Sequence, residues 1–155
     1  MLEETVGKLL MEKQLTIACA ESCTGGLLTS CLTDVEGSSA YVMGSVVSYT
    51  NEVKESLVGV KHETLVTHGA VSEETAREMA EGIRHVIGTA LGVGITGIAG
   101  PGSGTETKPV GLVYIAVAGD KGTTVKKNIF HGRRMENKRS SVEKALEMLH
   151  AYLDQ

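Results

Sequence analysis

The chain has 155 residues, a formal net charge of −4 and 41% hydrophobic residues. This length suits one domain with its own core, so we expect a single domain over residues 1–155. No apolar run approaches the ~20 residues that span a bilayer, which argues against a membrane partner. The acidic net charge and a 3% aromatic content argue against nucleic-acid binding. An odd count of three cysteines and an acidic N-terminus unlike a secretory signal favour the cytoplasm.

Hydrophobic periodicity predicts alternating helices and strands in the first half of the chain. The two periods involved are about 3.6 residues for helices and 2 residues for strands. The expected elements are a helix over 2–10, a buried strand over 15–20, a helix over 24–34, a strand over 41–49 and a helix over 51–57 that Asn51 caps.

The second half continues the same alternation. Ser72 is the expected N-cap of a helix that runs to Ile87. The later elements are strands over 91–98, 110–118 and 123–130, with a hairpin turn over 120–122, and a last helix that ends near 153. Helices that separate strands imply an α/β fold. We expect a three-layer α/β/α sandwich with a mostly parallel sheet and one antiparallel hairpin.

A candidate nucleophile follows the first predicted strand. Ser22, Cys23 and Thr24 stand at the strand-to-helix turn and precede two glycines. The first N–H groups after such a turn are free to bind an oxyanion. A different interpretation is that Ser22 and Thr24 only cap the helix. Cys23 is also the more intrinsically reactive group, because a helix N-terminus lowers the pKa of a thiol.

The candidate base is Lys54, in the segment Tyr49-Thr50-Asn51-Glu52-Val53-Lys54. A lysine must be neutral to accept a proton, and burial could make it so. Tyr49 could relay a proton or hold Lys54 in place. The alternative is that Lys54 lies on the surface, as most lysines do.

Residues 92–104 are rich in glycine, and their first six match G-x-G-x-x-G. The match is misleading, because these glycines lie within a predicted strand and no helix follows, as a dinucleotide site requires. The segment also lacks a Walker A lysine. It is either a structural turn or a loop whose backbone approaches a ligand closely, and its length favours the loop.

Cations are concentrated near the end of the chain. The segment 121–139 contains seven cations and one acid, whereas the rest of the chain is acidic. Its lysines suit a solvated face, and its arginines Arg133, Arg134 and Arg139 suit a small anion. Cysteines and histidines show no spacing typical of a metal site, so we expect neither a metal nor another cofactor.

Six ordered segments carry a resemblance to a known family. They are Ala20–Gly26, Gly37–Ala40, Tyr49–Lys54, His68–Ser72, Thr96–Pro101 and Lys108–Gly111. Together they resemble the CinA C-terminal domain family, in its stand-alone nicotinamide-nucleotide amidase (PncC) form. The similarity extends over essentially the whole chain. Thr50 replaces the serine that is usual in the third segment.

The resemblance implies an amidohydrolase that converts nicotinamide mononucleotide to nicotinate mononucleotide and ammonia, a step of NAD salvage in the pyridine nucleotide cycle. It implies catalysis by Ser22 and Lys54, assisted by Tyr49. The substrate-binding residues it implies are Cys23, Thr24, Gly25, Ser39, Thr96, Gly97, Gly100, Arg134 and Arg139. Ser39 is also a further candidate nucleophile.

We expect a small-molecule nucleotide as substrate and a homo-oligomer as the assembled form. Two alternatives stay open. One is a nucleotide-binding regulatory module without turnover, since the family name refers to competence and DNA damage. The other is a nucleic-acid partner that the basic segment would bind.

Overall fold

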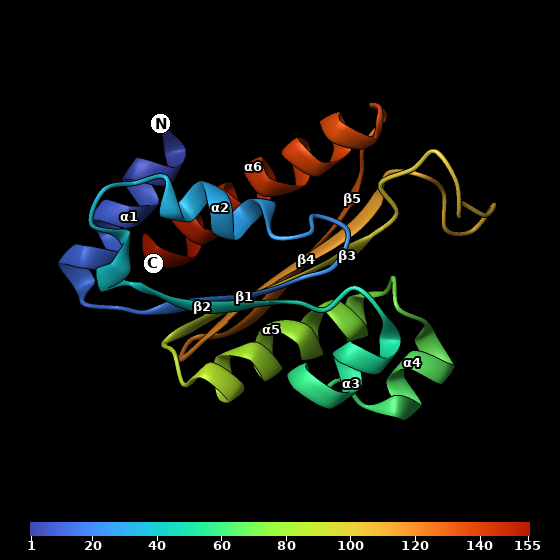
Figure 1. Cartoon of the computed structure of the whole chain (residues 1–155), viewed down its shortest axis with the longest axis horizontal. Helices are drawn as coiled ribbons and strands as arrows, with labels where there is room; N and C mark the ends of the chain where they lie inside the picture. Colours follow the sequence, from blue (N-terminus) through green and yellow to red (C-terminus); the bar gives the residue numbers. More distant parts are fainter.

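The computed structural model describes all residues from 1 to 155 and contains one five-stranded sheet (Figure 1). The strands lie in the order β2-β1-β3-β4-β5. Their bounds are β1 Ile17–Glu21, β2 Val42–Val47, β3 Leu91–Gly97, β4 Leu112–Gly119 and β5 Gly122–Ile129.

Helices cover both faces of the sheet, so the expected three layers are confirmed (Figure 1). One face carries α3 (Asn51–Val58), α4 (His62–His68) and α5 (Glu73–Ile87). The other face carries α1 (Leu2–Lys13), α2 (Leu27–Thr33) and α6 (Arg134–Leu153). A single 3-10 turn, η1 (Ser38–Ala40), precedes β2.

Strand directions differ in one respect from the expectation. The three strands β2, β1 and β3 are parallel, and β4 and β5 form the expected hairpin. However, β4 also pairs antiparallel with β3, so the sheet has two antiparallel pairings. The cause is the connection from 98 to 111, which contains no helix. A chain can return directly beside its own strand only in the antiparallel direction, because a parallel return needs a crossover.

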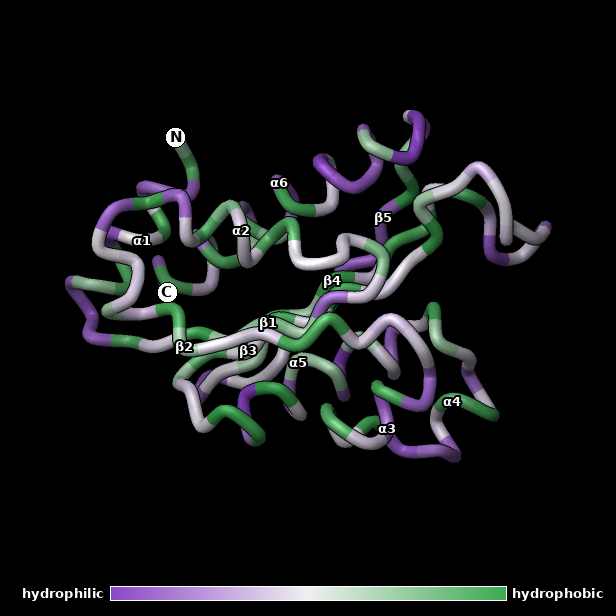
Figure 2. The backbone as a smooth tube through the Cα atoms, viewed as in Figure 1, coloured by the Kyte–Doolittle hydropathy of each residue, from purple (hydrophilic) through white to green (hydrophobic).

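The larger hydrophobic core lies between the sheet and α1, α2 and α6, and a smaller one lies under α3, α4 and α5. Figure 2 shows hydrophobic segments along the strands and hydrophilic ones on the outer turns of the helices. The glycines of β3 serve packing against α5. A Cβ on Gly94 would lie 2.5 Å from the carbonyl oxygen of Ala76, and one on Gly92 would collide with that of Ala80. These glycines let helix and strand approach closely.

Two local expectations were wrong, and one helix was missed. Helix α2 begins at Leu27 rather than near 24, because the preceding residues form a turn with two left-handed glycines. The N-cap of α3 is Thr50, whose hydroxyl accepts the N–H of Val53, and not Asn51. Helix α4 was not expected at all.

Candidate active site

Ser22 lies where β1 ends, at the carboxyl edge of the parallel strands. Its N–H donates to the carbonyl of Ile95 on β3 at 2.9 Å, and its own carbonyl accepts the N–H of Gly25 at 3.1 Å. Gly25 and Gly26 have φ angles of 59° and 100°, which other residues adopt at a cost. The turn therefore presents the Ser22 side chain to a pocket while the backbone stays anchored to the sheet.

Glu21 fixes this turn from inside the protein. Its side chain is fully buried. One carboxylate oxygen accepts the Thr24 hydroxyl at 2.6 Å and the Leu28 N–H at 2.9 Å. The other accepts the Thr29 N–H at 2.9 Å and the Thr29 hydroxyl at 2.7 Å. Four donors thus tie the start of α2 to the end of β1.

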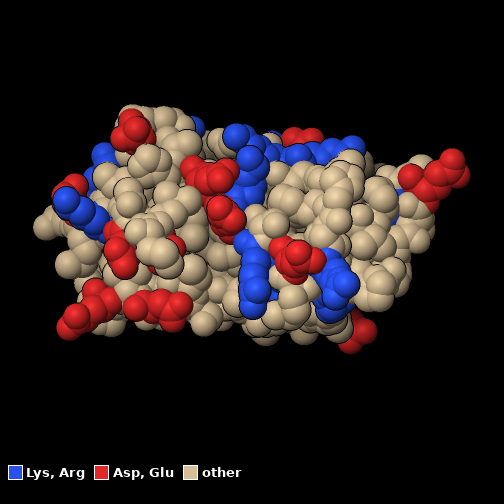
Figure 3. Space-filling view, turned by 90° about the horizontal axis from the view of Figure 1, so that it is seen from above, with Lys and Arg blue, Asp and Glu red and all other residues tan.

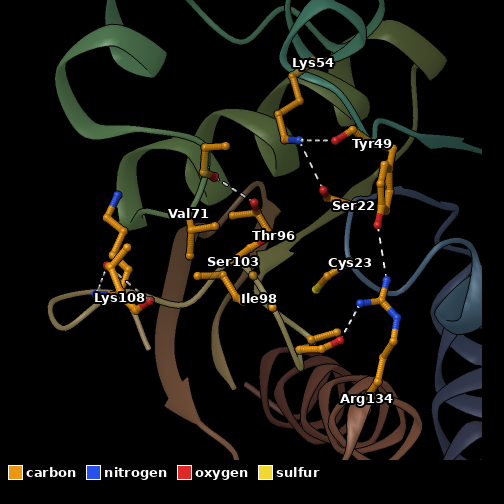
Figure 4. A pocket seen from close by; sticks show the side chains of 16 residues that line it. Ser22, Cys23, Tyr49, Lys54, Val71, Thr96, Ile98, Ser103, Lys108 and Arg134 are labelled. Carbon is orange, nitrogen blue, oxygen red and sulfur yellow. Dashed lines mark hydrogen bonds between the residues drawn. The ribbon is translucent and has the colours of Figure 1, made fainter. Parts of the chain in front are cut away.

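Lys54 reaches Ser22 from α3, across the end of the sheet (Figure 4). Its side chain is only 1% exposed. The Nζ atom lies 3.2 Å from Ser22 Oγ, 2.9 Å from the Ser48 carbonyl and 3.2 Å from the Tyr49 carbonyl. No acidic side chain forms an ion pair with it. Burial lowers the pKa of Lys54 from its ordinary value, and the neighbouring Cys23 acts weakly in the opposite direction.

The three partners of Lys54 suit a neutral amine. Such an amine has two N–H donors and one lone pair. The two carbonyls can accept both donors, and the lone pair is then left for the hydroxyl hydrogen of Ser22. A neutral Lys54 can therefore take a proton from Ser22, whereas the ammonium form would donate to all three partners.

Cys23 lines the same pocket but has a different environment. Burial raises the pKa of its thiol to about 11, so the thiolate is scarce at neutral pH. The backbone N–H groups of Cys23 and Thr24 donate to no carbonyl of the chain. They are therefore available to an oxyanion that forms beside Ser22.

The opposite wall of the pocket is the glycine-rich loop that follows β3. The Thr96 hydroxyl donates to the Ala70 carbonyl at 2.7 Å, which joins this wall to the α4–α5 connection. At the other end, Arg134 donates to the Gly100 carbonyl at 2.7 Å and to the Tyr49 hydroxyl at 3.3 Å. The Tyr49 side chain is 58% exposed, and only its carbonyl contacts Lys54.

The pocket has a volume of about 480 Å³, which is adequate for a small ligand. Its lining includes three basic side chains, Lys54, Lys108 and Arg134, and no aspartate or glutamate. In a chain with a net charge of −4, the charges of Lys108 and Arg134 without a carboxylate beside them favour an anionic ligand. Figure 3 shows basic side chains gathered over the middle of the face that α1, α2 and α6 cover.

Most of the expected site residues meet in this pocket. Those that line it are Ser22, Cys23, Tyr49, Lys54, Thr96, Gly97, Gly100 and Arg134. Two others lie beside it without lining it. Thr24 turns its hydroxyl inward to Glu21, and Gly25 forms the turn beneath Ser22.

The structure does not bring Arg139 or Ser39 to the pocket. Arg139 lines a separate groove with Leu2 and Cys31, because it is five positions beyond Arg134. Five positions turn the side chain by roughly 140° around the helix. Ser39 is exposed in η1, before β2 begins, whereas the pocket lies where the parallel strands end.

Two contributors were not assigned from the sequence. Lys108 closes one end of the pocket and donates to the His68 carbonyl at 2.7 Å. Asn137 is buried at the start of α6, accepts the Gly132 N–H and donates to the Ala99 carbonyl, each at 2.9 Å. A buried asparagine within a charged helical segment gives no distinct sequence signal. Lys108 was visible only as part of a family segment.

No group of three or more histidine, cysteine, aspartate or glutamate side chains is placed to hold a metal ion. None of the helices combines the length and the apolar character that crossing a bilayer requires.

The fold and the site together define an α/β protein with a buried serine–lysine pair at the carboxyl edge of its sheet. Residues 1–153 match the model of the CinA C-terminal domain. The chain therefore belongs to the CinA C-terminal domain family.

Relatives of known sequence carry names that refer to competence and DNA damage. A protein of Moorella thermoacetica with the name "putative competence-damage inducible protein" is 48% identical over 96% of this chain. A protein of the same name from Clostridium perfringens is 50% identical over 99% of this chain. The matched regions are only 36% and 37% of these relatives, so the chain spans about a third of their length.

Solved structures of similar proteins superpose on nearly the whole length of this chain. The competence/damage inducible protein CihA of Agrobacterium tumefaciens superposes with a TM-score of 0.92 at 40% identity, covering 100% of this chain and 97% of the other. The competence damage-inducible protein A of Klebsiella pneumoniae gives 0.96 at 32% identity, covering 99% and 96%.

Proposed function

We propose that the protein is an amidohydrolase that removes ammonia from the carboxamide of nicotinamide mononucleotide and yields nicotinate mononucleotide. The observation that carries the proposal is the 3.2 Å contact between Lys54 Nζ and Ser22 Oγ, buried in a pocket without carboxylates. A serine paired with a neutral amine is an activated nucleophile. The nicotinamide nucleotide is the substrate implied by the family resemblance.

The first half of the reaction forms an ester with the enzyme. Ser22 Oγ attacks the carboxamide carbon as its proton passes to Lys54 Nζ. The oxygen of the tetrahedral intermediate accepts hydrogen bonds from the N–H groups of Cys23 and Thr24. The C–N bond then breaks, and the ammonium form of Lys54 returns the proton to the departing nitrogen, which leaves as ammonia.

The second half uses water. Neutral Lys54 takes a proton from a water molecule, whose oxygen attacks the ester carbon. The same N–H groups stabilise the second tetrahedral intermediate. The bond to Ser22 Oγ breaks, Lys54 reprotonates that oxygen, and the carboxylic acid ionises as it is released. Each step leaves both residues in their starting states.

The charge of the pocket supports a phosphorylated amide over free nicotinamide. Lys108 and Arg134 line the pocket and place two positive charges at its border. The glycines of the loop after β3 leave room for the backbone to contact a ribose. By the same reasoning, nicotinamide without its phosphoribosyl group would be a poor substrate.

The proposal is tested by measuring ammonia release from nicotinamide mononucleotide and from nicotinamide. We expect release from the nucleotide by the wild type and by Cys23→Ala, and none by Ser22→Ala. Binding of the nucleotide without ammonia release would instead support a regulatory module without turnover. We also propose that the protein is a cytoplasmic homo-oligomer, which sedimentation and fractionation can test.

A further inference from the structure

Lys138 is a half-buried cation on α6 without a partner. Its side chain forms neither an ion pair nor a hydrogen bond with any other residue of the chain. Its Nζ lies 3.8 Å from the position that a Cβ of Gly25 would occupy. Its charge is also close enough to lower the pKa of Cys23, against the larger effect of burial. Lys138 therefore stands over the turn that carries Ser22.

Arg134 and Lys138 lie on the same face of α6, because they are four positions apart. Arg134 uses one nitrogen for the Gly100 carbonyl and another for the Tyr49 hydroxyl. A guanidinium has five N–H donors, so Arg134 keeps donors for a ligand. Arg134 lines the pocket, Lys138 lies beside it over the Gly25 turn, and no acidic side chain lines the pocket.

We infer that Lys138 and Arg134 together bind the phosphate of the nucleotide substrate, and that Lys138 determines the preference for a phosphorylated substrate over a nucleoside. The inference rests on the proposed function for the identity of the reacting amide. The absence of a side chain at Gly25 leaves space for the phosphate oxygens next to Lys138 Nζ. A phosphate in this position would neutralise two charges that the folded chain leaves without an anion.

Two other basic residues fit this role less well. Lys108 lines the pocket too, but its Nζ is already held by the His68 carbonyl at 2.7 Å. Arg139 is next to Lys138 in sequence, yet it faces the separate groove formed with α1 and α2. Arg139 is therefore a matched control, since its replacement removes the same charge from the same helix without touching the pocket.

The first experiment measures kcat/KM for nicotinamide mononucleotide and for nicotinamide riboside in Lys138→Ala, Lys138→Arg, Lys108→Ala and Arg139→Ala. We expect Lys138→Ala to lose about 10- to 150-fold on the nucleotide, which is the effect of one charge-assisted contact. The loss on the riboside should be small, Lys138→Arg should restore most of the nucleotide activity, and Arg139→Ala should resemble the wild type. Equal losses on both substrates, or a phosphate-dependent loss in Lys108→Ala alone, would overturn the inference.

The second experiment separates the phosphate site from the reaction. Titration calorimetry measures the binding of ribose 5-phosphate, with ribose as the control ligand. We expect Lys138→Ala to weaken the binding of ribose 5-phosphate by about 10- to 150-fold, the same factor as for kcat/KM on the nucleotide. Arg139→Ala should bind ribose 5-phosphate as the wild type does. This result would support the phosphate site even if the wild type released no ammonia, an outcome that would reject the proposed function only. Undetectable binding by the wild type, or equal binding by the wild type and Lys138→Ala, would reject the phosphate site.

Discussion

Two buried ionisable groups lie on either side of Ser22, and their surroundings differ. Glu21, at the end of β1, is enclosed by four hydrogen-bond donors from the Thr24 turn and the start of α2. Lys54, on α3, contacts two carbonyls and the Ser22 hydroxyl, with no anion nearby. Both side chains are essentially inaccessible to water.

The difference shows that burial alone does not make a group reactive. Every strong acceptor position of Glu21 is satisfied by a backbone or hydroxyl donor, so the carboxylate holds the turn in place. Lys54 lacks a counter-charge, and its pKa falls because burial disfavours the ammonium form. One group therefore fixes the geometry of the turn that carries Ser22, and in the proposed reaction the other exchanges a proton with Ser22.

The largest expected effect on activity comes from replacing Ser22 or Lys54. Ser22→Ala should abolish ammonia release, and Lys54→Ala should lower kcat by about 10²- to 10⁴-fold, the contribution of a general base. Because the two residues act as a unit, the double variant should be no worse than Ser22→Ala alone. Measured kcat values for the three variants test this.

Cys23→Ala is the control for the adjacent thiol, and we expect it to keep most of the wild-type kcat. The thiol has a pKa of about 11, so little thiolate is present at neutral pH. A fully active Ser22→Ala together with an inactive Cys23→Ala would transfer the nucleophilic role to the thiol.

The pH dependence of kcat/KM tests whether Lys54 or Cys23 is the group whose ionisation controls the reaction. Lys54 must be neutral to act, and its pKa is lowered from 10.5. We therefore expect kcat/KM to rise with pH through the lowered pKa and to level off below pH 10.5. Cys23→Ala should retain this profile, which excludes the thiol as its source. A rate that does not depend on pH over this range would contradict a lysine base.

The same shift has a consequence for stability. Between the lowered folded-state pKa of Lys54 and its unfolded value near 10.5, the unfolded chain binds more protons. The contribution of Lys54 to the free energy of unfolding should therefore rise with pH across this window, and be lost as pH falls through the folded-state pKa. Urea unfolding of the wild type and Lys54→Met at several pH values tests this. If the difference in the free energy of unfolding between the two proteins did not change with pH, the lowered pKa of Lys54 would be contradicted.

Glu21→Gln tests the structural side of the comparison. The amide replaces one acceptor oxygen with an NH₂ group that must face N–H or hydroxyl donors. We expect a loss of about 1–3 kcal/mol in the free energy of unfolding, measured by urea denaturation. Glu12→Gln, on the exposed side of α1, should change it little. Equal stabilities of the two variants would mean that the four bonds contribute nothing.

Local patterns predicted most of the fold. The period of apolar residues located every strand, and Ser72 caps α5 as expected, its hydroxyl accepting the N–H of Thr75. Helix α4 contains only two large apolar residues, Leu65 and Val66, which are adjacent and therefore show no helical period. The antiparallel pairing of β3 with β4 depends on how a long loop returns to the sheet, which no local pattern reports.

The site was predictable where it follows from the turn after β1, and less so where it depends on helix orientation. Ser22 and Lys54 are 32 positions apart, and the family resemblance brought them together before the structure did. Arg134 and Arg139 were both expected to bind the substrate, whereas the structure places Arg134 in the pocket, Arg139 in a separate groove and Lys138 over the Gly25 turn. Adjacent helical residues point in directions roughly 100° apart, so a basic run alone does not identify the residue that faces the ligand.

The smallest expected effect is that of a chelator. In the proposed reaction, Ser22 supplies the nucleophile, Lys54 moves the proton and two backbone N–H groups stabilise the oxyanion, so no step requires a Lewis acid. The chain also offers no cluster of three metal-ligating side chains. Prolonged dialysis against a chelator should therefore leave kcat/KM within experimental error of the untreated enzyme. A loss of activity that one particular divalent ion restores would show that the serine–lysine pair does not act alone, and would reassign part of the oxyanion stabilisation to that ion.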